Sequence, residues 1–540
     1  MNHNRLRNSL LFIAAIILSG CDQSPQNLTE IASAEPVHAP QDYITHNETY
    51  NPEAVIPPQC YTKTEGKNNP CYICHQSYTG DRARPNMMND GFLQGSYDFS
   101  DIGNTNRWSN LFKNRSAEID NIDDDFMRNY INQDNYSALA AWFQSDAWRG
   151  RAPVIANLAD GAGAFDQDGL ALDGSRWVAF NYKPVPSTFW PTNGSTDDVM
   201  IRLPDAFSEI DGQYSRDLYF ANLSLLEMAI VDKSSLPSIA LDEGASGIDF
   251  NGDGQLDSGV TSVNRTTHYF GDAKKFPVTH MLYPQGTEFL HTVRYVGIKE
   301  DGSITNARRM KEVRYMRKDT FMPKERLTNS YYREAKEKHF GNLPAVVNHD
   351  DRGMSNSMGW LLWGFIENAD GKMRKQNDQE QFFCMGCHKT IGTTIDQTFA
   401  FARKKPGASG WGYIDLKSLT DAPNIGETQG EYLTYLERVG GGDEFRQNAE
   451  MLERWFDSKG MVKREKVAAQ ETLYDLITPS PERALDLNKA YYRIVHEQSF
   501  LFGRDAVLTP ADNVYQTIDT AIEPLDSEHR YSWDIRLDWE

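Results

Sequence analysis

The sequence lacks an apolar run long enough to cross a bilayer. Its two longest apolar stretches, Leu10 to Leu18 and Met358 to Ile366, reach roughly half of the ~20 residues that a membrane-spanning helix needs. The second stretch is therefore expected to be a buried core segment. The sequence also lacks a phosphate-binding loop and a recognisable nucleophile triad. Basic residues are in deficit, with 55 Lys and Arg against 76 Asp and Glu and a net charge of −21. An acidic surface repels nucleic acid, so no nucleic-acid partner is expected.

The first twenty residues are typical of a bacterial export signal. Arg5 and Arg7 form a positively charged n-region, the apolar stretch from Leu10 to Leu18 follows, and the signal ends at Leu18-Ser19-Gly20-Cys21. This tetrapeptide resembles a lipobox, which implies cleavage before Cys21 and attachment of lipid to its sulfur. The alternative is an ordinary signal peptide with an incidental cysteine. We predict a lipid-anchored protein of the cell envelope that faces the periplasm. Asp22 favours the inner membrane, and the outer membrane remains the alternative.

Cysteine is scarce, and four of the six cysteines fall in two copies of one pattern. The copies are Cys71-Tyr72-Ile73-Cys74-His75 and Cys384-Met385-Gly386-Cys387-His388. Two thiols two residues apart can add to the two vinyl groups of one porphyrin, and the histidine that follows can bind the iron. The alternative is a zinc half-site or a redox pair of cysteines. The spacing predicts two covalently bound haem c groups, with His75 and His388 as proximal iron ligands.

These two pentapeptides resemble the attachment sites of the c-type cytochrome superfamily. The resemblance implies a membrane-tethered electron carrier with two haems and a redox partner protein, which would be basic because this chain is acidic. It leaves open a second function, that of an enzyme similar to dihaem peroxidases or oxygenases with one open coordination position. A binding module in which haem is accessory is a third.

Ligands on the distal sides of the haems are harder to predict. For the second haem we favour His496, which lies in an expected C-terminal helix, and for the first Met87 or Met88, which follow its motif. Cys60 is left over after lipid and haem, and it could be a buried inert residue, an intermolecular or stray thiol, or a thiolate ligand of the first haem. His291 is expected to be an ordinary core or surface residue of a strand.

The segment from Asp249 to Asp257 resembles a calcium loop. It supplies oxygen ligands at alternate positions and a glycine at the sixth position for the sharp turn. Val260 stands where such loops carry a bidentate glutamate, and an acidic turn without an ion is the alternative. We predict a structural Ca²⁺ site; its ligands would be Asp249, Asn251, Asp253, Gln255 and Asp257.

Periodicity predicts an α+β fold in which largely helical or irregular haem-binding regions flank a β-rich central module. Alternating residues predict a hairpin from Glu288 to Lys318 with its turn at 300–302, and helical spacing appears over 116–143, 443–457 and 482–499. The expected divisions are a signal peptide at 1–20, a flexible tether at 21–55, a first haem region at 56–150, a β-rich module at 151–325 and a second haem region at 326–540.

Overall fold

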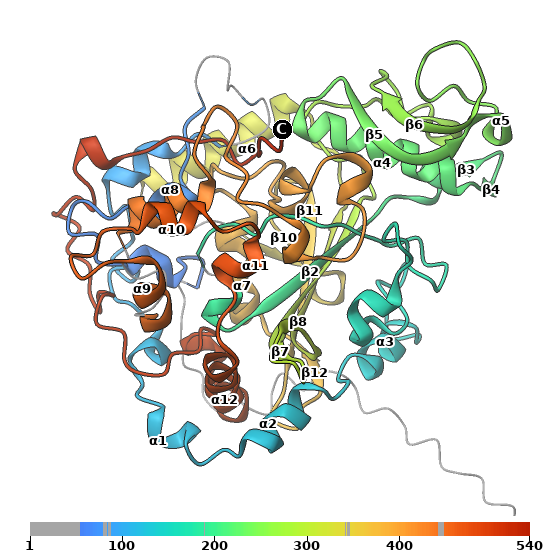
Figure 1. The fold of residues 1–540 in the computed structure, drawn as a ribbon. Coiled ribbons are helices and arrows are strands. Elements are labelled where there is room, and N and C mark those ends of the chain that lie inside the picture. The colour runs from blue at the N-terminus through green and yellow to red at the C-terminus, as the bar shows by residue number, and fades with distance from the viewer. Residues whose placement is uncertain are drawn as a thin grey trace, which may run out of the picture. The chain divides into compact units, whose positions relative to one another are not determined.

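An antiparallel sheet forms the centre of the protein (Figure 1). The computed structural model describes residues 54–78, 84, 88–187, 189–340, 342, 346–440 and 448–540. The predicted signal peptide, nearly all of the tether, Cys21 and Met87 therefore lie outside the described residues. In the described part the sheet has eight strands in the order β1-β2-β7-β8-β11-β10-β9, with β12 beside β11.

The strands of this sheet come from the middle third of the chain. They are β1 (Val178–Ala179), β2 (Thr196–Arg202), β7 (Glu288–Ile298), β8 (Ile304–Lys318), β9 (Val347–Asn348), β10 (Met354–Ser355), β11 (Trp360–Glu367) and β12 (Met373–Lys375). Two small sheets pair β3 (Glu209–Ile210) with β4 (Gln213–Tyr214) and β5 (Ser235–Asp242) with β6 (Ser258–Asn264). The predicted hairpin is confirmed as β7 and β8. The predicted core segment becomes β11, whose eight residues are all buried.

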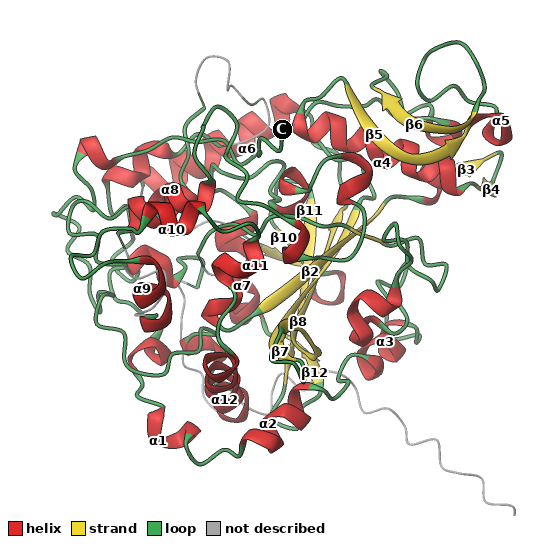
Figure 2. Cartoon of the chain, in the orientation of Figure 1, coloured by secondary structure: helices red, strands yellow, loops and turns green. Residues whose placement is uncertain are grey.

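Helices lie before, between and after these strands, which confirms the α+β class (Figure 2). They are α1 (Ser116–Ile119), α2 (Asp124–Ile131), α3 (Ser137–Phe143), α4 (Arg216–Val231), α5 (Glu243–Ser246), α6 (Lys324–His339), α7 (Asp378–His388), α8 (Glu431–Val439), α9 (Ala449–Trp455), α10 (Arg464–Ala468), α11 (Leu473–Ile477) and α12 (Pro481–Glu497). No helix in the described ranges is both long and apolar enough to cross a membrane.

Both faces of the main sheet are covered, because successive side chains of a strand point to opposite faces. Leu290 of β7 and Val313 of β8 pack with Leu139 and Phe143 of α3 on one face. Phe289 and Met316 belong to the larger cluster on the other face, which includes Cys384 and Met385 of α7. The sheet also extends past the boundary expected at residue 325, since β9 to β12 complete it. The central module and the second haem region therefore share one core.

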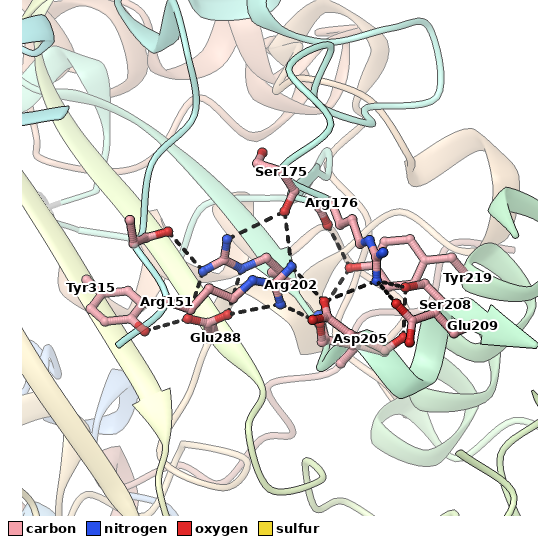
Figure 3. A network of polar contacts seen from close by, with 12 residues as sticks. Arg151, Ser175, Arg176, Arg202, Asp205, Ser208, Glu209, Tyr219, Glu288 and Tyr315 are labelled. Carbon is pink, nitrogen blue, oxygen red and sulfur yellow. Dashed lines mark hydrogen bonds and ion pairs between the residues drawn. The ribbon is translucent and has the colours of Figure 1, made fainter. Parts of the chain in front are cut away.

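A network of ion pairs ties the end of the sheet to the loops beside it (Figure 3). Arg202 of β2 makes two hydrogen bonds to Glu288 of β7, at 2.6 and 2.9 Å, and the Tyr315 hydroxyl of β8 donates to the same carboxylate at 2.5 Å. Arg151 and Arg176 continue the network to other acidic residues. Three neighbouring strands are thereby held in register where the sheet ends.

Candidate functional site

The second Cys-x-x-Cys-His pattern occupies the last turn of α7. Asn377 caps this helix: its side chain accepts from the Glu380 N–H at 2.9 Å, and the Glu380 carboxylate accepts from the Asn377 N–H at 2.9 Å. Cys384, Cys387 and His388 line one cavity. Glycine is required at position 386, since a Cβ there would lie 2.3 Å from the backbone oxygen of Val55. The local sequence thus presents two thiols and an imidazole to the same space.

His388 is oriented by a single hydrogen bond. Its Nδ1 lies 2.8 Å from the backbone oxygen of Gln397, and because a carbonyl only accepts, Nδ1 carries the proton. Burial lowers the pKa of His388 to about 4, so the ring is neutral at pH 7. A neutral imidazole with Nδ1 fixed in this way offers Nε2 as a metal ligand, which is the usual state of an iron-binding histidine.

The first pattern makes a single helical turn as well. Cys71–Ile73 is a short 3-10 helix, and the His75 N–H donates to the Cys71 oxygen at 3.0 Å. Nδ1 of His75 lies 2.8 Å from Oδ2 of the buried Asp90. Asp90 also accepts from the N–H of Gly392 at 3.0 Å, just beyond the second pattern. One carboxylate therefore links the histidine of the first pattern to the loop that follows the second.

The two patterns face two adjoining cavities. Each cavity opens to solvent, and the space between its walls, with its mouth included, is about 1960 Å³ at the second pattern and about 1450 Å³ at the first. Cys74 and Cys387 line both cavities, as do Pro57, Gln59 and Pro70. The sequence places the patterns more than 300 residues apart, and the fold brings them side by side.

The main sheet forms the wall of the second cavity opposite α7. His291 of β7 and Arg314 of β8, which are paired in register, both line it. Lys311 of β8 lines it too, and burial lowers the pKa of this amine to about 7. None of these three residues was predicted to belong to a site. His291 and Arg314 alternate with apolar residues along their strands, which is a sequence signal for a shared face, whereas Lys311 lies at a register shift of the β7–β8 pair that alternation does not predict.

The cysteine pairs do not combine into a zinc site. In the described ranges, no group of three or more His, Cys, Asp or Glu is placed to hold a metal ion. The arrangement is one of two thiols and one histidine at each cavity. It suits thioether attachment of a porphyrin better than a four-ligand zinc centre.

The predicted distal ligands separate in the structure. Met88 is buried and lines the first cavity with His75, and Cys60 lines the same cavity. His496, predicted for the second haem, is exposed on α12 with its ring against Tyr492 and lines neither cavity. The physical reason is helix geometry: α12 turns Tyr491, not His496, toward the second cavity. The histidine that the structure does bring there is His291.

The predicted calcium loop connects α5 to β6. Asp249 accepts from the N–H groups of Gly252 and Gly254, at 2.6 and 2.8 Å. The buried Glu243 carboxylate accepts from the N–H groups of Phe250 and Asp257, at 2.6 and 3.2 Å. Glu243 was not among the predicted residues. It precedes the loop in the chain and holds it through these hydrogen bonds to backbone N–H groups. In the described ranges no three acidic side chains of the loop are placed together to hold a metal ion, and the calcium site stays a prediction.

Comparison with known proteins gives two matches and one negative result. The model of a lipoprotein family matches residues 44–474. A protein of Aquifex aeolicus (strain VF5) named "Uncharacterized lipoprotein" is 30% identical over 543 residues, which cover 86% of this chain and 88% of the relative. No solved structure matches.

These matches overturn the predicted assignment to the c-type cytochrome superfamily, which is wrong. The prediction of an electron carrier, and its alternative of a dihaem peroxidase or oxygenase, falls with it, because the family and the relative are described as lipoproteins and neither description supports such a function. The error has a physical source. A pentapeptide determines the chemistry of one helical turn, whereas the family is determined by several hundred residues that build the sheet and its covering.

Proposed function

The chain belongs to this lipoprotein family, and on that premise we propose that it is a lipid-anchored envelope protein that binds two haem groups covalently. The observation that carries the proposal is that the two Cys-x-x-Cys-His turns present their thiols and imidazole rings to two adjoining cavities. Cys71, Cys74 and His75 would hold one group, and Cys384, Cys387 and His388 the other. When bound, haem supplies an iron centre whose properties depend on its axial ligands and its burial.

The chain's own residues prepare both sites in the same way. An acceptor holds Nδ1 of each histidine, the Asp90 carboxylate for His75 and the Gln397 carbonyl for His388. This contact sets the ring orientation and leaves the other nitrogen for iron. Asp90 differs from Gln397 in carrying charge, which increases the donor strength of its histidine. We therefore propose two haem sites that are alike in attachment and unlike in electronic environment.

Attachment to the membrane follows from the lipoprotein family, and the choice of membrane is the finer proposal. Asp22 directly follows the predicted lipidated Cys21, and we propose retention at the inner membrane with the protein facing the periplasm. A protein that docks on this surface would carry basic charge, because the chain has a net charge of −21.

Counting haem in the purified protein tests the proposal. We expect two haems per chain by the pyridine haemochrome assay and haem that stays with the polypeptide on a denaturing gel. Cys384→Ala combined with Cys387→Ala should leave one haem, whereas Cys60→Ser, a change at a cysteine outside both patterns, should leave two. Protein that matures in cells able to attach c-type haem and yet contains none, or haem that acid acetone extracts, would contradict covalent binding.

A further inference from the structure

We infer that His291 is the second axial ligand of the haem held by Cys384, Cys387 and His388. This inference rests on the proposed function, because it concerns the iron of that haem. It assigns a ligand that lies in the centre of the sheet, far along the chain from the attachment motif, and it makes this haem six-coordinate with two histidines.

The position of His291 on the sheet points it at the motif. His291 pairs with Val199 of β2 and with Arg314 of β8. Phe289 and Val293, two residues before and after His291, line the same cavity. All three side chains therefore project from the same face of β7. That face is the one opposite α7. The imidazole therefore enters the second cavity from the wall facing Cys387 and His388.

The ring of His291 has a nitrogen without a hydrogen bond. Its Nε2 is buried and makes none, although Oδ2 of Asp197 lies 3.3 Å away. That carboxylate oxygen already accepts from the Tyr182 hydroxyl at 2.6 Å. A buried polar nitrogen left without a bond costs about 1–3 kcal/mol, and binding to iron would remove that cost.

His291 and His388 line the same cavity, the first from β7 and the second from the end of α7. The fold therefore brings two imidazole rings to one space from two different elements.

Met316 of β8 is the competing ligand in this cavity, since a thioether also binds haem iron. Met316 is 8% exposed and packs in the same apolar cluster as Phe289 and Trp360. It therefore has a structural role that needs no iron. His291 has an unsatisfied nitrogen and a carboxylate beside it, so the structure favours the imidazole.

Optical and electron paramagnetic resonance spectra of the purified full-length protein test this assignment. We expect His291→Gly to convert one of the two haems from a low-spin to a high-spin state and added imidazole to restore it. His291→Met should keep that haem low-spin and raise its reduction potential, because methionine in place of histidine favours the reduced iron. Met316→Leu and His496→Ala are the matched controls, and both should leave the spectra unchanged.

The outcomes separate this inference from the proposed function. If the wild type carries two haems and His291→Gly leaves every spectrum unchanged, His291 is not a ligand and only this inference fails. A spin change in Met316→Leu would assign the position to the thioether and overturn the inference equally. Wild-type protein without covalent haem would refute the proposed function itself. Should His291→Gly not fold, the potential and spectrum of His291→Met decide.

Discussion

Glu312 of β8 balances two partly buried guanidinium groups at the wall of the second cavity. Its carboxylate accepts from Arg314 and from Arg504, each at 2.9 Å, and from the Gln376 amide at 3.2 Å. Burial alone would raise the pKa of Glu312, but the two arginines outweigh it and lower the pKa to about 2. The carboxylate is therefore charged in the folded protein at neutral pH.

We predict that Glu312→Gln lowers the free energy of unfolding by about 3–5 kcal/mol at pH 7, because it leaves partly buried positive charges unpaired. The contribution of Glu312 is fully present above its ordinary pKa of about 4.5 and is lost as the pH falls toward 2. The gap in melting temperature between wild type and variant should therefore narrow below pH 4.5. Calorimetry across this range measures it.

The control for this prediction is Glu300→Gln, a change at an exposed glutamate of the β7–β8 turn. Its effect should stay within about 0.5 kcal/mol. Equal losses in the two variants, or a gap that does not change with pH, would contradict the role assigned to Glu312.

At the scale of elements, the capping box of α7 prepares the second attachment turn. We predict that Asn377→Ala costs about 1 kcal/mol of stability and increases hydrogen exchange at the first amides of α7. Asp123→Ala is the matched control, since Asp123 caps α2 by accepting from the Phe126 N–H at 2.9 Å. It should cost a similar amount and leave exchange in α7 unchanged. Unaltered α7 exchange in Asn377→Ala would show that packing alone holds the helix.

The loop between α5 and β6 carries the calcium prediction. Asp249, Asp253 and Asp257 place three carboxylates within one short turn, and a bound divalent cation would relieve their repulsion. We expect Ca²⁺ at a hundred times its dissociation constant to stabilise the protein by about 2.7 kcal/mol, and we expect Asp253→Ala to abolish the effect. Calorimetry of metal-free protein, with and without Ca²⁺, makes the measurement.

Asp301→Ala provides the comparison for that loop, because Asp301 also accepts a backbone N–H within an exposed turn, from Ser303 at 2.9 Å. This variant should keep the full response to Ca²⁺. If metal-free wild type melts at the same temperature with and without Ca²⁺, the segment is an acidic turn held by Glu243.

At the scale of the whole molecule, the predicted lipidation site, Cys21, lies outside the described ranges. We predict that Cys21→Ser moves the folded protein from the membrane fraction to the soluble periplasm, or leaves the precursor unprocessed, because no sulfur remains for lipid. Cys60→Ser should leave the distribution unchanged. A wild type recovered entirely in the soluble fraction would contradict the anchor, and recovery in the outer membrane would contradict only the inference from Asp22.

Local sequence determined the features that depend on neighbouring residues. The alternation from Glu288 to Lys318 predicted β7 and β8, because a strand repeats every two residues. The apolar segment that became β11 was recognised as core by its length and composition. The two Cys-x-x-Cys-His patterns are single helical turns in the structure, and the haem that they predict stays a proposal.

Tertiary structure alone decided which distant residues meet these turns. Asp90 and Gly392 are joined across 302 residues, and Cys74 and Cys387 line common cavities although more than 300 residues of chain separate their motifs. His291 looked like an ordinary strand residue and His496 like a ligand, because sequence reasoning weighed only nearness along the chain. From the register of β2, β7 and β8 we infer the reverse assignment, with His291 as the ligand, because register determines from which face of the sheet each side chain projects. A shift of one residue would turn His291 into the opposite core.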